Sequence, residues 1–321
     1  MLATLLSATL QGIAGRIVRV EVDVAPGLPG FTIVGLPDAA LSEARERVRG
    51  ALRNAGFHHP PRRITVNLAP AELRKAGASL DLAIALGILL GSDQVQASPG
   101  RVALIGELGL GGEVRRVPGI LPMCLALGAR GVRRVVVPAD AVAEAALAPG
   151  VEPIPVADVA EAADALRARR SRRARPVALP RAGSPADGTG LPADAAPDGP
   201  STVAVREATV VDLADVRGQA VARRALEIAL AGDHALLLIG PPGVGKTLLA
   251  RTIPPLLPDL DDAAALSATV VASAASPIPV VDLVRRPPVR TPHHTTSYAG
   301  MVGGGPRMSP GEVTLADKSV C

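Results

Sequence analysis

A glycine-rich run of eight residues constrains the fold of this chain more than any other feature. The run covers residues 240–247 and reads Gly-Pro-Pro-Gly-Val-Gly-Lys-Thr. The apolar residues 235–239 before it are typical of a buried parallel strand, and residues 248–251 after it can open a helix. A strand, a glycine loop and a helix in this order form a phosphate-binding loop, whose backbone N–H groups face negative charge. A chance Gly/Pro turn, the alternative in a Gly- and Pro-rich chain, would not explain the flanking elements.

The residue types in this loop predict separate roles in binding a nucleoside triphosphate. Lys246 is expected to reach the β- and γ-phosphates, and the hydroxyl of Thr247 is expected to ligate Mg²⁺. The loop recognises phosphates and not the base, so it does not choose between ATP and GTP. The predicted nucleotide-binding residues are Gly240, Pro241, Pro242, Gly243, Val244, Gly245, Lys246, Thr247 and Leu248.

Composition divides the 321 residues into two ordered parts and a linker. Residues 1–166 alternate strand and helix patterns and predict one compact α/β domain. Residues 167–206 are rich first in Arg and then in Pro, Ala and Gly, which predicts a flexible linker because little apolar surface is available for burial. The Arg cluster is more simply a solvated hinge than a contact to DNA phosphates. Order resumes over residues 207–321.

The hydrophobic pattern predicts the elements of the first domain. Alternating polar and apolar residues indicate strands, and apolar residues at helical spacing indicate helices. Asp38 can cap the first helix. The charged face of this helix is most simply solvated, and a nucleic-acid surface is the less favoured interpretation. The expected strands cover residues 1–10, 16–24, 31–34, 63–68, 102–107 and 134–138, and the expected helices cover residues 38–54, 80–90, 119–127 and those from 158 onward.

Composition also argues against several classes of function. Phe31, Phe57 and Tyr298 are the only aromatic residues, so few side chains are available to bind nucleic acid by aromatic stacking. The net charge of +4 is too small to demand a polyanionic partner. The two cysteines, Cys124 and Cys321, fit a reducing cytosol, and a cytoplasmic location is expected. The apolar N-terminus lacks a basic leader, and no run approaches the ~18 apolar residues of a membrane helix.

Several longer blocks of sequence resemble one protein family. Residues 212–247 (DLADVRGQAVARRALEIALAGDHALLLIGPPGVGKT) and 286–316 (RPPVRTPHHTTSYAGMVGGGPRMSPGEVTLA) resemble magnesium-chelatase-like AAA+ ATPases of the ComM/YifB competence-protein type. In the N-terminal half, VGLPDAALSEARERVRGALRNAGF, RRITVNLAPAELRKAGASLDLAIALGIL and IGELGLGGEVRRVPGILP resemble the same family. The blocks occur in the order of the family around the phosphate-binding loop.

The resemblance implies a fold and a set of partners. It implies a Lon-peptidase-like α/β domain, followed by a P-loop AAA+ module with a parallel sheet that is incomplete at the C-terminus. It implies ATP and Mg²⁺ as cofactors, self-association into a ring, and DNA as the partner of a branch-migration motor. Magnesium chelation belongs to a related branch and is not implied. No membrane partner is expected.

The Lon-like resemblance raises the question of peptidase activity. Such peptidases use a Ser–Lys dyad, in which the amine takes the proton of the serine. Ser79 stands at the matching nucleophile position, but the lysine position corresponds to Leu121. Peptidase activity is therefore not expected, and Ser79 is interpreted as a cap of the following helix.

Two pairs of adjacent histidines do not predict a metal site. Neighbours in an extended segment point to opposite faces, so one ion rarely binds both His293 and His294. The resemblance favours a structural or interface role for this pair within the ATPase ring. His58 and His59 precede two prolines, for which a turn is a sufficient explanation. No Cys/His spacing has zinc character.

The resemblance also implies an acidic strand end, the Walker B element, soon after the GEVTLA block. We find no such element: residues 316–321 read Ala-Asp-Lys-Ser-Val-Cys, and the two prolines of residues 277–282 are hostile to a central strand. The sequence therefore predicts ATP binding, a chain truncated before Walker B, and an unstable second half whose loop strand lacks neighbours. Whether ATP is hydrolysed stays open. The alternative is a non-catalytic interaction or oligomerisation module with a vestigial loop.

Overall fold

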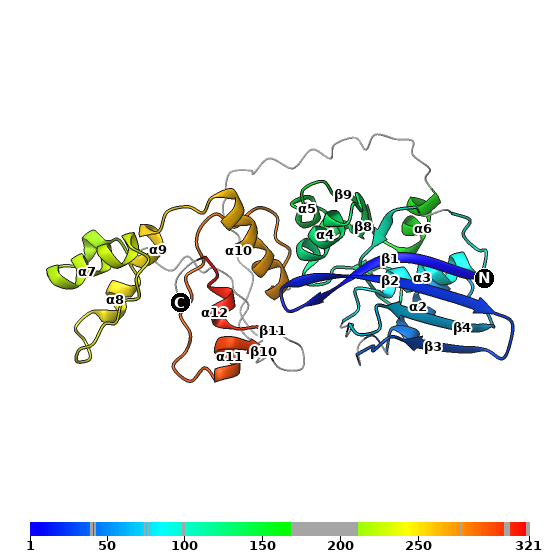
Figure 1. Ribbon diagram of the computed structural model, residues 1–321, viewed down its shortest axis with the longest axis horizontal. Coiled ribbons are helices and arrows are strands. Elements are labelled where there is room, and N and C mark those ends of the chain that lie inside the picture. The colour runs from blue at the N-terminus through cyan, green and yellow to red at the C-terminus, as the bar shows by residue number, and fades with distance from the viewer. Residues whose placement is uncertain are drawn as a thin grey trace, which may run out of the picture.

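A computed structural model describes residues 1–38, 41, 43–73, 75, 77–97, 100–167, 211–276, 278–304 and 309–318. The predicted linker lies outside these residues, apart from Arg167, which ends a helix. The α/β class expected from the sequence is confirmed (Figure 1).

The strands are β1 (Leu2–Gln11), β2 (Ala14–Ala25), β3 (Gly30–Val34), β4 (Arg63–Ala69), β5 (Val102–Leu104), β6 (Glu107–Leu108), β7 (Val114–Arg115), β8 (Arg134–Pro138), β9 (Glu152–Val156), β10 (Gly303–Gly304) and β11 (Ser309–Pro310). The α-helices are α2 (Ala44–Asn54), α3 (Asp81–Gly91), α4 (Ile120–Ala129), α5 (Val142–Ala146), α6 (Val159–Arg167), α7 (Ala220–Ala231), α8 (Lys246–Ala250), α9 (Ile253–Leu256), α10 (Asp262–Ala275), α11 (Tyr298–Val302) and α12 (Glu312–Leu315). Two short 3₁₀ helices are η1 (Ala139–Ala141) and η2 (Leu213–Asp215).

One seven-stranded sheet organises the N-terminal half, in the order β3-β4-β2-β1-β5-β8-β9. The β1–β2 hairpin and the β2–β4 pair are antiparallel, and the other four pairings are parallel. The alternation in β2 places Val18, Val20, Val22 and Val24 in the core, as period-2 patterning predicts. The edge strands are β3 and β9, so β3 is paired on one side only.

Helices cover both faces of this sheet and create two apolar cores. All residues of α3 are buried, and α3 packs on β1 and β2. A Cβ at Gly87 would lie 2.5 Å from Val22 Cγ2, so glycine allows this close approach. Helix α4 packs on the same two strands within a separate core cluster. A Cβ at Gly15 would collide with the backbone of α4. The hairpin is therefore held between two helices.

Most of the elements predicted for this half are confirmed, with small differences in their bounds. Within the expected helix over residues 38–54, α2 begins at Ala44; Leu41 is helical as well, and its N–H donates to Asp38 Oδ1 (2.8 Å), as expected of a cap. The expected strand over residues 102–107 is divided into β5, which ends at Leu104, and β6, which begins at Glu107. Strand β9 was not predicted, because prolines at two of its five positions mask the strand pattern; an edge position tolerates them.

A buried ion pair connects α2 with α3. Arg47 Nε lies 2.7 Å from Asp81 Oδ2, and Arg47 Nη2 lies 3.2 Å from Asp81 Oδ1. The Asp81 side chain is fully buried. Burial raises the pKa of Asp81 from its ordinary 3.8 to about 6, and the guanidinium of Arg47 opposes this rise. Desolvation of the carboxylate is thus only partly offset by its partner.

Helix α10 of the second half docks on the N-terminal half. Ser273 of α10 donates its hydroxyl hydrogen to Glu144 Oε1 (2.6 Å), and its carbonyl oxygen accepts from the N–H of Gly119 (2.9 Å). Glu144 is fully buried and ion-paired with Arg116, with 2.7 Å between Glu144 Oε2 and Arg116 Nη2. Leu266 of α10 packs beside the core around α4. The contact between the halves therefore contains both a polar network and apolar packing.

The pKa of Asp81 gives a prediction for the pH dependence of stability. Between pH 3.8 and 6 the folded carboxyl holds a proton that the unfolded chain releases, so the unfolding free energy falls as pH rises. Compared with Asp81→Asn, which does not titrate, the native chain should lose on the order of 2 kcal/mol from pH 4 to pH 7. Urea unfolding of both proteins at several pH values measures the difference. An unfolding free energy of the native chain that instead rises with pH relative to Asp81→Asn would show that the ion pair outweighs burial.

The α10 contact gives a second prediction. Ser273→Ala removes one hydrogen bond from a buried carboxylate, which should weaken docking by about 1–3 kcal/mol. Amide hydrogen exchange around Gly119 should accelerate, because that N–H donates to Ser273. Ser267→Ala is the matched control, because it also removes a hydroxyl from α10. The Ser267 hydroxyl donates to Asp317 and not to a residue of the N-terminal half. Equal amide exchange rates around Gly119 in both variants would contradict a role of Ser273 in docking α10.

Candidate nucleotide-binding site

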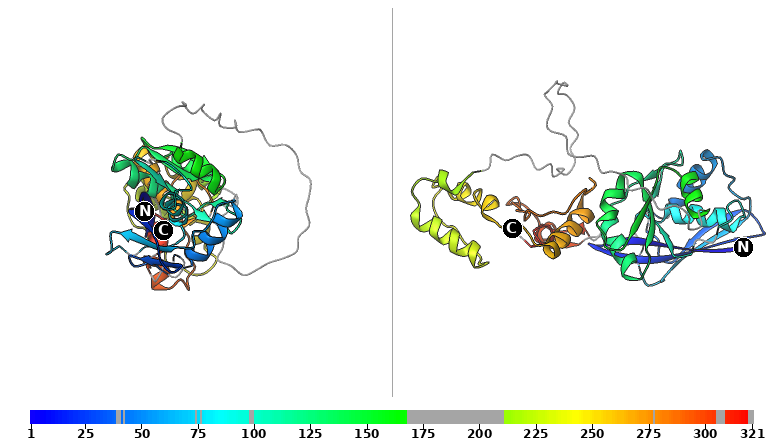
Figure 2. Two further views of the ribbon diagram at one scale, coloured as in Figure 1. Left: turned by 90° about the vertical axis from the view of Figure 1, so that its right-hand side faces the viewer. Right: turned by 90° about the horizontal axis from the view of Figure 1, so that it is seen from above.

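The predicted phosphate-binding loop is an open loop that leads into α8. Gly243 and Gly245 have φ values of 83° and 89°, in the left-handed region that favours glycine. Around both, a Cβ would meet nothing within 4 Å. Helix α8 begins at Lys246, two residues before the position expected from the sequence. The loop backbone is therefore free to lie against a ligand. Figures 1 and 2 show α7 and α8 at the end of the molecule opposite to the N-terminus.

The ammonium group of Lys246 lies over the loop that it belongs to. Its Nζ donates to the carbonyl oxygen of Gly240 (2.8 Å) and to that of Pro241 (2.7 Å). Thr247 and Leu248 are exposed, whereas Leu249 is buried with Leu226. The side chain at 249 thus fixes α8 to the small core, while those at 246–248 remain at the surface. A hydroxyl oxygen such as that of Thr247 is a suitable ligand for Mg²⁺, and an ammonium group such as that of Lys246 is a suitable partner for phosphate.

Gln219 contacts the loop and was not predicted from the sequence. Its Nε2 donates to the carbonyl oxygen of Val244 (3.1 Å). Gln219 precedes α7 and has a φ of 53°, which turns its side chain out of the helix. The only local signal was the preceding Gly218, which indicates a turn but not a contact 25 residues away. Gln219 therefore links the start of α7 to the loop.

The strand predicted before the loop is not formed. Residues 235–239 have no strand partner among the described residues. Leu237 and Ile239 are 80% and 87% exposed. An apolar segment becomes a strand only when neighbours satisfy its N–H and C=O groups, and none of the strands described for the second half lies beside it. The predicted uncovered apolar face is thus confirmed, and the predicted strand is wrong for this chain. The alternative acidic element around Asp282 is not a strand either, and Asp282 Oδ1 accepts from the N–H of Leu283.

The candidate peptidase residues do not form a dyad. Ser79 is 5% exposed, and its Oγ donates to the carbonyl oxygen of Ala8 (3.0 Å). The interpretation of Ser79 as a helix cap is wrong, because Leu80 occupies the cap position and no side chain caps α3. Leu121 is buried in α4. Lys75 is buried as well and its ammonium donates to the carbonyl oxygen of Pro70. Burial lowers the pKa of Lys75.

The two C-terminal histidines lie side by side rather than on opposite faces. The ring centroids of His293 and His294 are 4.2 Å apart and tilted by 36°, so the expected opposite orientation is wrong. His293 Nδ1 lies 2.7 Å from Thr295 Oγ1. Both residues are exposed. Within the described ranges no group of three His, Cys, Asp or Glu side chains is placed to hold a metal ion.

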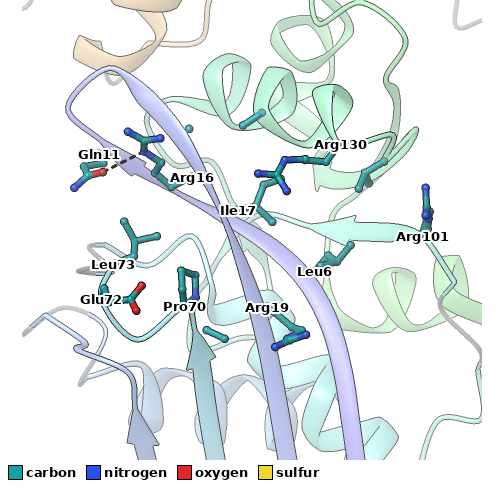
Figure 3. A pocket seen from close by; sticks show the side chains of 14 residues that line it. Leu6, Gln11, Arg16, Ile17, Arg19, Pro70, Glu72, Leu73, Arg101 and Arg130 are labelled. Atoms are coloured by element: carbon teal, nitrogen blue, oxygen red, sulfur yellow. Dashed lines mark hydrogen bonds between the residues drawn. The ribbon is translucent and has the colours of Figure 1, made fainter.

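A separate hollow on the N-terminal half is lined by four arginines. Its volume is about 1010 Å³, and it lies beside the β1–β2 hairpin. Figure 3 shows Arg16 and Arg19 on the hairpin, with Arg101 and Arg130 on the opposite side. Arg16 Nε donates to Gln11 Oε1 (3.1 Å), and Arg19 pairs with Glu21 (2.9 Å). The apolar part of this lining is aliphatic and contains no aromatic ring. The hollow offers positive charge without a stacking surface.

No helix in the part of the chain that the structure describes is both long enough and apolar enough to cross a membrane.

Comparison with known proteins places both halves in one family. The family model described as subunit ChlI of Mg-chelatase matches residues 20–141. The model described as magnesium chelatase, subunit ChlI, matches residues 212–321, which contain the phosphate-binding loop and α10. The two matches lie on either side of the predicted linker.

Similar proteins match nearly the whole chain. An uncharacterized protein of Mycobacterium tuberculosis H37Rv is 40% identical over 319 residues, 98% of this chain and 58% of that protein. The uncharacterized protein YifB of Escherichia coli K12 is 40% identical over 96% of this chain and 56% of its own length. The competence protein ComM of Haemophilus influenzae is 37% identical over 99% and 59%. The chain thus spans somewhat more than half the length of these relatives. It belongs to the magnesium-chelatase-like family that includes YifB and ComM.

Proposed function

We propose that the chain binds ATP with Mg²⁺ through residues 240–248. The observation that carries this proposal is the ammonium of Lys246, which lies over the loop and, among the described residues, donates to two of its carbonyl oxygens. Phosphate oxygens are stronger partners for an ammonium group than neutral carbonyls. On binding, Lys246 exchanges carbonyl partners for phosphate, and the N–H groups of the glycine loop surround the same anion.

The metal ion has a defined place in this proposal. The hydroxyl of Thr247 is exposed beside Lys246 and supplies a hard oxygen ligand. Thr247 would hold the metal ion, which would supply positive charge to offset that of the phosphates. Gln219 holds the carbonyl of Val244 and so positions the turn between Gly243 and Gly245. The choice of ATP over GTP is inferred from the family resemblance.

We further propose that this ATP site serves a ring-forming ATPase that acts on DNA in the cytoplasm. The support is the sequence resemblance, together with a relative whose name is competence protein. The exposed apolar residues 235–239 support a further step: the working ATPase includes covering strands and a Walker B carboxylate beyond the present 321 residues. The relatives are longer than the chain, which agrees with this step. The intact mass of the protein from its native locus tests it, and a mass equal to that of 321 residues would contradict it.

A second candidate function is a non-catalytic interaction module with a vestigial loop. The observation that favours it is the docking of α10 on the N-terminal half, which makes that half a platform for other segments. Nucleotide titration separates the two functions, because the platform requires no nucleotide.

The proposed site gives a prediction for Lys246. Lys246→Ala removes the charged partner of the phosphates, so the affinity for a fluorescent ATP analogue with Mg²⁺ should fall at least about tenfold. Lys318→Ala is the matched control, since it removes one exposed lysine that is not part of residues 240–248 and should leave affinity unchanged. Unchanged binding by Lys246→Ala would refute the site.

A further prediction concerns protection of the loop. Thermolysin, which cleaves before apolar residues, should cut between residues 235 and 239 because Leu237 and Ile239 are exposed. Magnesium-ATP should slow cleavage at this segment by ordering the adjoining loop, with no such effect in Lys246→Ala. Fragment masses over time measure the rates. Resistance of this segment without nucleotide would contradict its exposure in solution.

A further inference from the structure

A second arginine-rich hollow lies at the other end of the sheet and differs from the first in its aromatic content. It has a volume of about 770 Å³, within the range of ligand-sized pockets of about 300–1,000 Å³. Helix α2, the start of β3 and the loop over residues 57–62 line it. Both phenylalanines of the chain, Phe31 and Phe57, are part of this lining. A chain with two phenylalanines in 321 residues has thus placed both in one hollow.

The positive charge of the hollow is arranged as a row. Arg45, Arg49 and Arg53 follow one another at four-residue intervals on α2, and therefore share one face of the helix at a spacing of about 6 Å. Arg62 adds a fourth positive charge from the loop. Glu46 is the only carboxylate among the described residues of the lining, and it pairs with Arg45 (3.2 Å).

Three of these arginines are available to a ligand. Arg49, Arg53 and Arg62 form no ion pair within the described residues. All three are exposed. An exposed row of unpaired guanidinium groups attracts an extended anion, because each group can donate to a separate charged oxygen.

The aromatic part of the hollow is held in place by packing and by hydrogen bonds. Phe31 and Phe57 are half-buried and pack against the core. The Phe31 and His59 rings lie 6.1 Å apart, and His59 Nε2 is buried with no hydrogen-bond partner among the described residues. The side chain of Gln94 fixes the loop, because it accepts from the N–H of His58 and donates to its carbonyl oxygen, each at 2.8 Å. The rings are therefore preorganised.

We propose that this hollow binds single-stranded nucleic acid. The arginine row tracks the phosphodiester backbone, and one or two unpaired bases stack on the rings of Phe31 and Phe57. An acidic peptide would satisfy the arginines but would leave the rings unused, and a duplex would not present free base faces. The inference rests on the DNA part of the proposed function and assigns it a surface outside the nucleotide site.

The arginine row is tested by direct binding without nucleotide. The full chain is titrated into a fluorescent single-stranded oligothymidylate, and anisotropy is recorded at several salt concentrations. Arg49→Gln with Arg53→Gln should weaken binding at least about tenfold and lower the salt-dependence slope by about 1.4, the loss of two phosphate contacts. The matched control is Arg101→Gln with Arg130→Gln, which removes the same charge from the hollow in Figure 3. Equal losses in both pairs would overturn the proposal, because they would show a general effect of charge.

The aromatic contribution is tested from both sides of the contact. Phe31→Leu with Phe57→Leu keeps the apolar packing and removes the rings, so affinity should fall roughly fivefold or more. An abasic oligonucleotide of the same length should bind the native chain more weakly by a similar factor. The same oligonucleotide pair should show no difference on the leucine variant. A difference that persists there would overturn stacking on these rings.

Two further measurements decide between ligand classes and between the two proposals. Polyglutamate should compete poorly; competition as strong as that of oligothymidylate would overturn the proposal in favour of an acidic peptide. Tighter binding of a duplex of the same length would overturn it as well. Lys246→Ala should retain oligothymidylate binding while losing ATP, so failure of the nucleotide site would be distinguishable from failure of this hollow.

Discussion

The packing of α3 against the β1–β2 hairpin is the contact on which the rest of the described structure depends. Helix α3 is buried along its whole length, and Gly87 allows its backbone to approach Val22. Apolar burial of this extent is the main favourable contribution to folding. The hairpin fixed in this way is covered by α4 on its other face, and α4 in turn receives α10. Each later contact thus presupposes the first.

The second half has no comparable core among its described residues. Its apolar cluster around the loop contains four buried side chains, and the apolar residues before the loop remain exposed. The contact of α10 with Glu144 and Gly119 instead joins this half to the N-terminal core. A loop with few buried neighbours opens and closes at low cost.

Charge is distributed over the surface in two distinct arrangements. The hollow beside the β1–β2 hairpin combines arginines with aliphatic side chains, whereas the hollow beside α2 combines an arginine row with two phenylalanine rings. Both are lined by residues of the N-terminal half and not by the loop over residues 240–247. Composition alone pointed away from aromatic stacking, because it counts rings over the chain and not over a surface. The structure adds that residues 31 and 57 line the same hollow.

The sequence by itself determined the periodic elements of the N-terminal half and the glycine turns of the loop over residues 240–247. These follow from local rules: alternation gives strands such as β2, and only glycine readily adopts the φ values of residues 243 and 245. Tertiary structure alone decided that residues 235–239 stay unpaired, that Gln219 contacts Val244, and that Ser273 reaches Glu144. Strand pairing and contacts between distant residues depend on which neighbours are present, and local patterns do not encode those neighbours.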